Sequence, residues 1–500
     1  MRGLAVLGFW AALTWPVIAL AQAVPAQVEY ADCALLGFEA DAFDAAVACG
    51  WLRVPETETA DAPTLKLAFV RIPALDAASG QPPILYLHGG PGIAALDLAP
   101  RALKGRSWPL LRRGHDLIFL DYRGVGRSTP ALCPAFNQAM EAMSRESLAP
   151  ATALARRVEA ARACRADLLA EHLDPSAYGA DAIARDAEAL RIALGYDRWA
   201  VFATSYGVFP AVELMRRHPE TLTGVLLDSA FPPDSTNRSE QFSATAEAFA
   251  ALQARCDAEP ACAARHPEIR ASAGRVAARL EIEPVRLADR SVDGAAFNEA
   301  LWTLLVDGFT APLLPELVRR LDAGDAELMR RFIETFGRSD VFGGYAHATA
   351  WLANCHDLWP RATRPAVARA IADHPDLAIG RMPEAQDQVC AALGAGALPA
   401  EFHRPIGSDV PTLIFFGEFD PATPRSDALA ARAGLSRALL IEVAGASHAP
   451  FYTDDCTRSV GAAFLADPSV APDLSCLGAR PLPRLHDPEA FEAFELSLAP

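Results

Sequence analysis

The sequence has very little lysine and a deficit of positive charge. Lys66 and Lys104 are the only lysines, and 45 basic residues stand against 62 acidic ones, which gives a formal net charge of −17. Nucleic acids bind basic protein surfaces, so this balance argues against a nucleic-acid partner. A negative field favours cationic or N-terminally charged ligands, although acidity also serves solubility in general.

Beyond its first 23 residues the sequence lacks any apolar run long enough to cross a bilayer. The exception, residues 4–20, follows the single charge of Arg2 and precedes the small-x-small triplet Ala21-Gln22-Ala23. This pattern predicts a signal peptide over residues 1–23, export to the periplasm or the extracellular space, and no stable membrane insertion after cleavage. An uncleaved anchor is the alternative, which the shortness of the run and Pro16 disfavour.

The sequence also lacks any Cys-x-x-Cys pair, and His356 beside Cys355 is isolated, so we expect no metal site. The number of cysteines is even, and all lie beyond the predicted cleavage site. An oxidising compartment turns such a set into disulfides. Sequence neighbours form the candidate pairs, which are Cys33 with Cys49, Cys133 with Cys164, Cys256 with Cys262, Cys355 with Cys390, and Cys456 with Cys476.

Length and composition predict a globular protein of two packed units. The chain has 500 residues, of which 51% are hydrophobic and 21% charged. After Pro232-Pro233 the sequence becomes rich in alanine, arginine and leucine with helical periodicity and without a convincing series of strands. We therefore expect a core from residues 24–233 and 406–500, with a helical cap inserted over residues 234–405.

Short apolar runs outside the cap alternate with helical segments, which predicts a mostly parallel sheet with right-handed crossovers. In such sheets ligands gather at the carboxyl ends of the strands. The predicted strands are 51–55, 65–72, 84–87, 117–120, 199–203, 225–227, 412–416 and 438–443.

The segment Ala203-Thr204-Ser205-Tyr206-Gly207 lies between a predicted strand and a helix. It fits a nucleophile elbow, in which small flanking residues let strand and helix approach around a strained serine. In an alanine-rich chain such a pentapeptide also occurs by chance. Pro210 removes an amide from the following helix, which predicts a kink at its start.

A glycine-rich turn, His88-Gly89-Gly90-Pro91-Gly92, follows the predicted strand 84–87. Acyl transfer creates an oxyanion that preorganised backbone amides stabilise. We expect one donor from Gly89 or Gly90 and the other from Tyr206, the residue after the serine. An ordinary glycine turn is the alternative.

Two further strand ends carry an acid and an imidazole. Asp420, which we prefer to Glu418 because a proline follows it in a tight turn, comes after strand 412–416, and His448 comes after strand 438–443. The order Ser205, Asp420, His448 is the order of a hydrolase triad in this type of fold. A turn-capping aspartate and a lone surface histidine are the alternatives.

Together these motifs resemble the proline iminopeptidase and tripeptidyl aminopeptidase family of serine peptidases. The similarity extends to residues 121–128 (Asp-Tyr-Arg-Gly-Val-Gly-Arg-Ser), to Leu227-Asp228-Ser229, and to the tail from Phe416 to Cys476. It implies the α/β-hydrolase fold with a cap, release of residues from peptide N-termini, and no metal or organic cofactor. The chain departs from the family pattern at Ala203, where glycine is usual, and at residues 208–210.

The sequence therefore predicts an exported serine hydrolase that acts through an acyl-enzyme on a peptide or small ester substrate. A carboxylesterase acting on small esters or lactones would use the same residues, and a catalytically silent binding protein is the other alternative. Haloalkane and epoxide hydrolases need a carboxylate where Ser205 stands. No prediction follows for the natural substrate or the oligomeric state.

Overall fold

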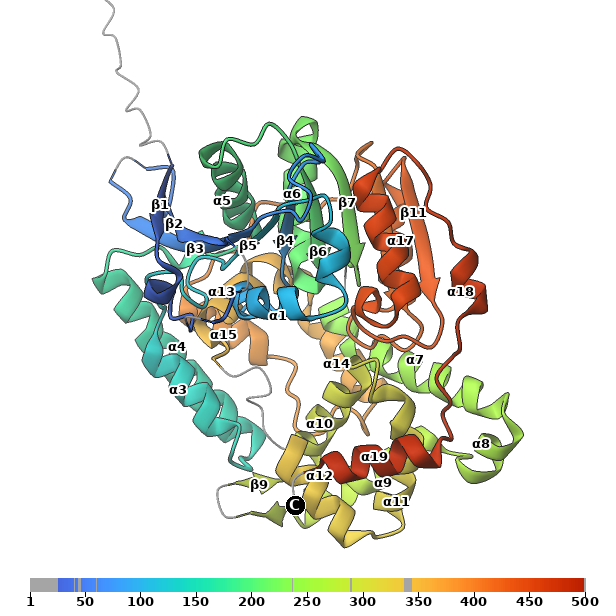
Figure 1. Ribbon diagram of the computed structural model, residues 1–500. Coiled ribbons are helices and arrows are strands. Elements are labelled where there is room, and N and C mark those ends of the chain that lie inside the picture. The colour runs from blue at the N-terminus through green and yellow to red at the C-terminus, as the bar shows by residue number, and fades with distance from the viewer. Residues whose placement is uncertain are drawn as a thin grey trace, which may run out of the picture.

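The computed structural model describes residues 26–39, 41–43, 46–59, 61–235, 237–287, 290–336 and 344–498. The predicted signal peptide, residues 1–23, lies outside these residues. Figure 1 shows a large sheet flanked by helices and, below it, a second, helical unit.

A nine-stranded sheet forms the centre of the fold, in the order β1-β2-β3-β5-β4-β6-β7-β10-β11. The first three strands and the β3–β5 pair are antiparallel, and every pair from β5 to β11 is parallel. All eight predicted strands are present, and β1 is additional. The bounds are β1 (Gln27–Ala31), β2 (Ala48–Pro55), β3 (Thr64–Ile72), β4 (Ile84–Leu87), β5 (Leu117–Leu120), β6 (Trp199–Thr204), β7 (Leu222–Asp228), β10 (Thr412–Gly417) and β11 (Ala438–Val443).

Both faces of the sheet are buried, because successive side chains along each strand point to opposite sides. Leu87 and Ala203 belong to the core on one face, and Tyr86 and Phe202 belong to the core on the other. The first face packs against α5 (Ala180–Ala193), α6 (Val208–Arg217) and α16 (Arg425–Ala433). The second packs against α1 (Ala99–Lys104), α2 (Trp108–Leu111) and α17 (Asp455–Ala466). This layering is that of the predicted α/β class.

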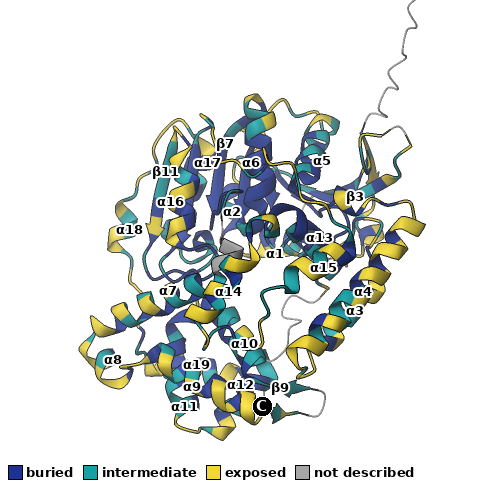
Figure 2. Cartoon of the chain, turned by 180° about the vertical axis from the view of Figure 1, so that it is seen from behind, coloured by how far each residue is buried: buried dark blue, intermediate teal, exposed yellow. Residues whose placement is uncertain are grey.

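The helical unit has its own apolar core, separate from the two cores of the sheet. Figure 2 shows its buried residues below the sheet. Its helices are α7 (Asn237–Asp257), α8 (Pro260–Arg265), α9 (Ile269–Ile282), α10 (Gly294–Val306), α11 (Leu314–Asp322) and α12 (Ala326–Phe336). Among the described residues of the predicted cap, the only strands are the short β8 (Val285–Arg286) and β9 (Ser291–Val292).

The boundaries of the cap remain predictions. Two regions pack in a unit other than the one to which those boundaries assign them. The C-terminal helix α19 (Pro488–Ser497) contributes Phe491 and Phe494 to the core of the helical unit. Conversely, α13 (His347–Asp357) and α15 (Ala385–Leu393) pack in the core on the α5–α6 side of the sheet. The remaining helices are α3 (Pro134–Met143), α4 (Pro150–Ala170), α14 (Arg364–Asp373) and α18 (Ser475–Ala479).

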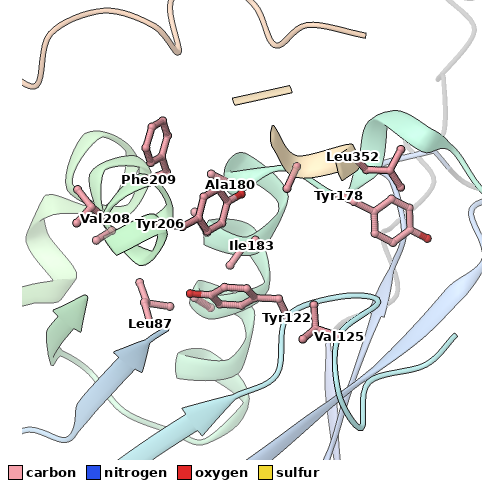
Figure 3. Close-up of a cluster of buried hydrophobic side chains, with 14 of the residues drawn as sticks. Leu87, Tyr122, Val125, Tyr178, Ala180, Ile183, Tyr206, Val208, Phe209 and Leu352 are labelled. Carbon is pink, nitrogen blue, oxygen red and sulfur yellow. The ribbon is translucent and has the colours of Figure 1, made fainter. Parts of the chain in front are cut away.

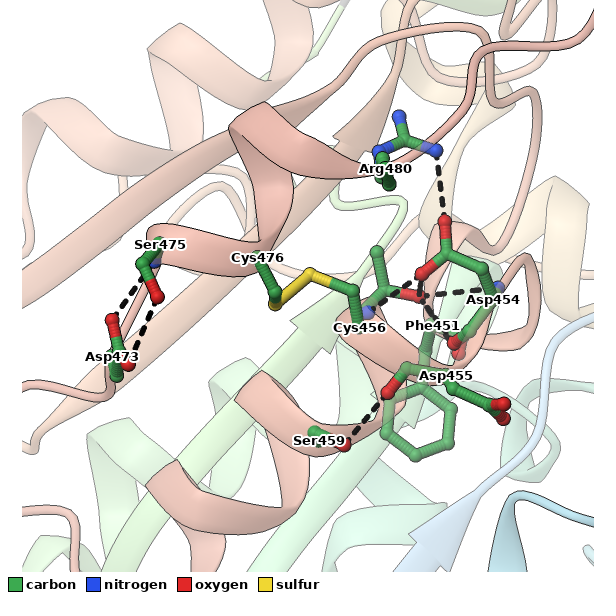
Figure 4. Close-up of a disulfide and its surroundings, with 10 residues drawn as sticks. Phe451, Asp454, Asp455, Cys456, Ser459, Asp473, Ser475, Cys476 and Arg480 are labelled. Atoms are coloured by element: carbon green, nitrogen blue, oxygen red, sulfur yellow. Dashed lines mark hydrogen bonds and ion pairs between the residues drawn. A yellow bond between two sulfur atoms is a disulfide. The ribbon is translucent and has the colours of Figure 1, made fainter.

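The structure joins the ten cysteines in the five pairs expected from their order in the sequence. Figure 4 shows one of them, in which Cys456 near the start of α17 is bonded to Cys476 in α18. Disulfides persist in oxidising environments, so these bonds point to an exported compartment.

Within the described ranges, no single helix has both the length and the apolar character that a bilayer crossing requires. One pair of helices, Gly294–Val306 and Ala311–Asp322, together meets the length and composition requirements of a membrane span, but the chain bends by 120° at the break between them.

Candidate active site

Ser205 stands at a sharp turn directly after β6. Its φ is 55°, in the left-handed region that a non-glycine residue rarely adopts, and the residues Ser205–Gly207 form one 3-10 turn before α6 begins. A Cβ atom at Gly207 would lie 2.1 Å from the carbonyl oxygen of Leu87, so strand and helix approach too closely there for any side chain. The turn has the geometry of a nucleophile elbow.

Ala203 and Pro210, two of the residues that depart from the family pattern, are both accommodated. The methyl group of Ala203 is fully buried in the core on the α6 side of the sheet. Pro210 lies in the first turn of α6, where its missing N–H leaves no helical hydrogen bond unmade. The 3-10 turn before Val208 therefore takes the place of the predicted kink.

The glycine-rich turn after β4 lies against the serine. A Cβ atom at Gly89 would be 2.8 Å from Ser205 Cβ and 3.4 Å from its Oγ. The Gly89 amide donates to His88 Nδ1 at 2.7 Å, and burial lowers the pKa of His88 to about 4, so the imidazole stays neutral and can accept. Of the two predicted donors in this turn, the amide of Gly90 is the one that this bond leaves for a substrate.

Asp420 and His448 form a hydrogen-bonded pair. His448 Nδ1 lies 2.8 Å from Asp420 Oδ2, and Asp420 is buried. The same Oδ2 accepts the Ser229 hydroxyl at 2.9 Å and the Thr423 hydroxyl at 2.5 Å. Burial alone would raise the pKa of Asp420, but the facing imidazole and the hydrogen bonds from the Thr423 hydroxyl and amide outweigh it and hold the pKa below its usual value. The carboxylate is therefore fixed and ionised at neutral pH.

The register of the sheet brings these loops to one edge. Thr204 pairs with Asp228 and Asp228 with Phe415, so the ends of β6, β7 and β10 lie abreast. Among the described residues no hydrogen bond joins Ser205 Oγ to the His448 imidazole. Such catalytic contacts are often long without substrate and tighten only in the complex.

Ser229 is a buried site residue that the sequence did not identify. Its φ is 62°, and besides donating to Asp420 its Oγ accepts the Ala449 amide at 2.8 Å. One hydroxyl thus links the acid to the loop that carries the imidazole. The only sequence signal was the family-like Leu227-Asp228-Ser229 segment, which assigned the serine no role.

The helical unit contacts the histidine loop directly. The His448 amide donates to the Val306 carbonyl at 3.1 Å, and the Ser447 hydroxyl donates to the Leu305 carbonyl at 2.5 Å. Leu305 and Val306 end helix α10. The packing of the helical unit therefore bears on the placement of the imidazole.

A metal is not implied by any side-chain cluster in the residues that the structure describes. No group of three or more His, Cys, Asp or Glu residues there has an arrangement that could hold an ion.

Two family profiles match separate parts of the chain. The profile described as alpha/beta hydrolase fold covers residues 82–265, and that described as TAP-like protein covers residues 376–476. They coincide with the elbow and with the acid and histidine loops respectively.

The chain is also similar to named proteins. It is 30% identical to a proline iminopeptidase of Aeromonas sobria, over 41% of this chain and 40% of that protein. It is 27% identical to a tripeptidyl aminopeptidase of Streptomyces lividans, over 43% of this chain and 40% of that protein. A solved proline iminopeptidase of Mycobacterium smegmatis aligns with a TM-score of 0.37 at 16% identity, covering 84% of this chain and 98% of that chain.

The match to each of these curated relatives spans less than half of the relative's length. The strand order, the elbow and the two family profiles nevertheless agree with one another. The chain has the α/β-hydrolase fold and is similar to proline iminopeptidases and tripeptidyl aminopeptidases.

Proposed function

We propose that the protein is an exported serine aminopeptidase with Ser205 as nucleophile, His448 as general base and Asp420 as the orienting acid. The observation that carries the proposal is the pair formed by buried Asp420 and half-buried His448, with 2.8 Å between Oδ2 and Nδ1, at the sheet edge where the strained Ser205 stands. These are the parts that an acyl-transfer site needs.

In this mechanism His448 accepts the Ser205 proton as Oγ attacks a carbonyl carbon. The amides of Gly90 and Tyr206 stabilise the oxyanion of the tetrahedral intermediate. His448 then donates its proton to the leaving amine, an acyl-enzyme remains on Ser205, and water releases the acyl group by the same steps in reverse order. Asp420 stays ionised throughout and stabilises the imidazolium form.

Two observations support peptide N-termini as the substrate class. Relatives named proline iminopeptidase and tripeptidyl aminopeptidase match over 41% and 43% of this chain, and the profile described as TAP-like protein matches residues 376–476. The net charge of −17 favours a substrate that carries a free ammonium group.

A substrate panel tests the proposal. Purified protein is offered prolyl-, aminoacyl- and tripeptidyl-arylamides with free and acetylated N-termini, beside p-nitrophenyl esters, with Ser205→Ala as the blank. We expect arylamide hydrolysis that requires the free N-terminus and disappears in Ser205→Ala. Hydrolysis of esters with no turnover of any arylamide would contradict the aminopeptidase assignment.

Hydrolysis of esters without arylamide turnover would favour a carboxylesterase. A segment of the chain is 36% identical to a carboxylesterase B of Mycobacterium tuberculosis over 84 residues, which is 17% of this chain and 16% of that protein. The same three residues and the same oxyanion donors would serve ester cleavage.

Export through cleavage after Ala23 belongs to the same proposal. The five disulfides support an oxidising compartment. N-terminal sequencing of secreted material should begin at Val24, and a mature chain that retains residues 1–23 would contradict the cleavage.

A further inference from the structure

Helix α13 belongs by sequence to the predicted cap, yet its two ends contact the two loops of the candidate oxyanion hole. At its C-terminal end lies Asp357, which is fully buried. Asp357 Oδ2 accepts a short hydrogen bond from the hydroxyl of Tyr206, the residue after the nucleophile. The same oxygen accepts the Ala180 amide at the start of α5, at 3.0 Å.

The N-terminal flank of α13 contacts the glycine-rich turn. The Ala346 amide donates to the Gly92 carbonyl at 2.9 Å, and the Tyr345 hydroxyl lies 3.5 Å from the Gly90 carbonyl. A Cβ atom at Gly92 would be 2.7 Å from the Ala346 carbonyl oxygen, so the two backbones are in close contact. The turn that carries the Gly90 amide is therefore fixed against the same helix as Tyr206.

The helix is held firmly between these contacts. Thr349 Oγ1 donates to the Gly124 carbonyl at 2.7 Å, and Cys355 is bonded to Cys390 of α15. Figure 3 shows Leu352 of α13 in the same buried cluster as Tyr206 and Ala180. A rigid support on both sides is what backbone donors need, because a backbone amide is aimed only by the conformation of its chain.

We propose that α13 aligns the two oxyanion donors and that Asp357 is the positioning residue that fixes the Tyr206 amide. The role rests on the proposed function, since it concerns the oxyanion of that reaction. Asp357 does not touch the reacting atoms and acts through the Tyr206 ring. Burial holds the pKa of Asp357 well above its ordinary value. Whether the Asp357 carboxyl group is protonated or ionised, one of its oxygens can accept the hydrogen bond from Tyr206.

Substitutions at the two ends of the Asp357–Tyr206 bond test the role. Asp357→Leu and Tyr206→Phe each remove one partner, Asp357→Asn keeps an acceptor oxygen, and His356→Leu is the matched control. His356 is the neighbouring buried residue, and its ring faces the Pro175 carbonyl at 3.3 Å rather than the elbow. Each folded variant is assayed for the rate of Ser205 labelling by a fluorophosphonate and for kcat and KM on the best substrate of the panel.

We expect Asp357→Leu and Tyr206→Phe to lower the labelling rate and kcat about 10- to 100-fold, because a donor is misaimed rather than deleted, with KM within about twofold. The double variant should be no slower than the slower single one, because both remove the same bond. Asp357→Asn should retain most of the wild-type rate, and His356→Leu should lose stability but keep its rate.

A further variant tests the other end of the helix. Gly92→Ala places a methyl group against the Ala346 carbonyl and should also lower kcat with little change in KM. If Asp357→Leu and Tyr206→Phe label as fast as His356→Leu, the positioning role is wrong although the triad stands. If the wild-type protein does not label, the proposed function itself fails.

Discussion

At the residue scale, hydrogen bonds from Ser229, Thr423 and His448 converge on Asp420 Oδ2. The positions of Ser205, Asp420 and His448 after strands β6, β10 and β11 were predictable because a short apolar run precedes each of them. Ser229 was not predictable, because its contact with the acid and with the histidine loop depends on β7 lying between β6 and β10. A single sequence does not reveal that strand order. The bond from the Gly89 amide to His88 was equally hidden, since it depends on the conformation of one turn.

Replacing Ser229 with alanine should impair both stability and catalysis. The change leaves the Ala449 amide without its side-chain acceptor and removes a donor from Asp420. The free energy of unfolding should fall by about 1–3 kcal/mol, and kcat by about tenfold. Urea unfolding and steady-state kinetics measure these effects, with Ser436→Ala, at an exposed hydroxyl, as control. Equal behaviour of the two variants would refute the linking role of Ser229.

Asp228 should make stability depend on pH. Burial raises its pKa from 3.8 to about 7, although the Phe451 amide and the nearby His448 partly offset the effect. Because the folded state holds this proton more tightly than the unfolded state, the stabilisation is complete below about pH 4 and is lost as pH rises through 7. Asp228→Asn cannot ionise, so it should gain stability relative to wild type between pH 4 and 8, by a few kcal/mol at most. Urea unfolding across this range would contradict the assignment if the difference stayed constant.

At the element scale, the elbow depends on strand β4, the 3-10 turn and helix α6 meeting without side chains between them. The strands and the turn were predictable because apolar runs and small residues mark them locally. The position of α13 was not, because helical periodicity shows that a segment is amphipathic but not which core receives its apolar face.

Replacing Gly207 with alanine should disrupt the elbow. The added methyl group would overlap the Leu87 carbonyl, which must move by more than an ångström to make room. We expect a loss of about 1–3 kcal/mol of stability, as for other overpacked sites, together with loss of most of the activity. Gly478→Ala, where nothing lies within 4 Å of the new Cβ, is the matched control. Thermal unfolding and arylamide turnover are the measurements, and a fully active Gly207→Ala would contradict the close approach.

At the scale of the whole molecule, the described chain contributes to each unit twice, from separate stretches of sequence. Helix α19 follows the last strand of the core but buries its apolar face in the helical unit, where Glu495 pairs with Arg320 at 2.5 Å. The sequence placed residues 406–500 with the core, because the alternation of strands and helices there gives no sign of where the final helix packs. The helical unit in turn bonds to the histidine loop through the carbonyl of Val306.

Phe494→Ala should therefore weaken the helical unit from a distant point in the sequence. Phe494 is 8% exposed, and truncating a buried phenylalanine costs about 3–5 kcal/mol. Leu496→Ala, two residues away and 74% exposed, should cost almost nothing. Urea unfolding compares them, and similar midpoints for the two variants would show that α19 does not pack in this core.

The nucleophilic role of Ser205 is tested most directly by mass spectrometry after treatment with a fluorophosphonate. The folded protein should gain one phosphonyl group, located by peptide mapping to Ser205. The label should be absent in Ser205→Ala and form far more slowly in His448→Ala. A folded wild-type protein that stays unlabelled, or that carries the label on another residue, would contradict the assignment.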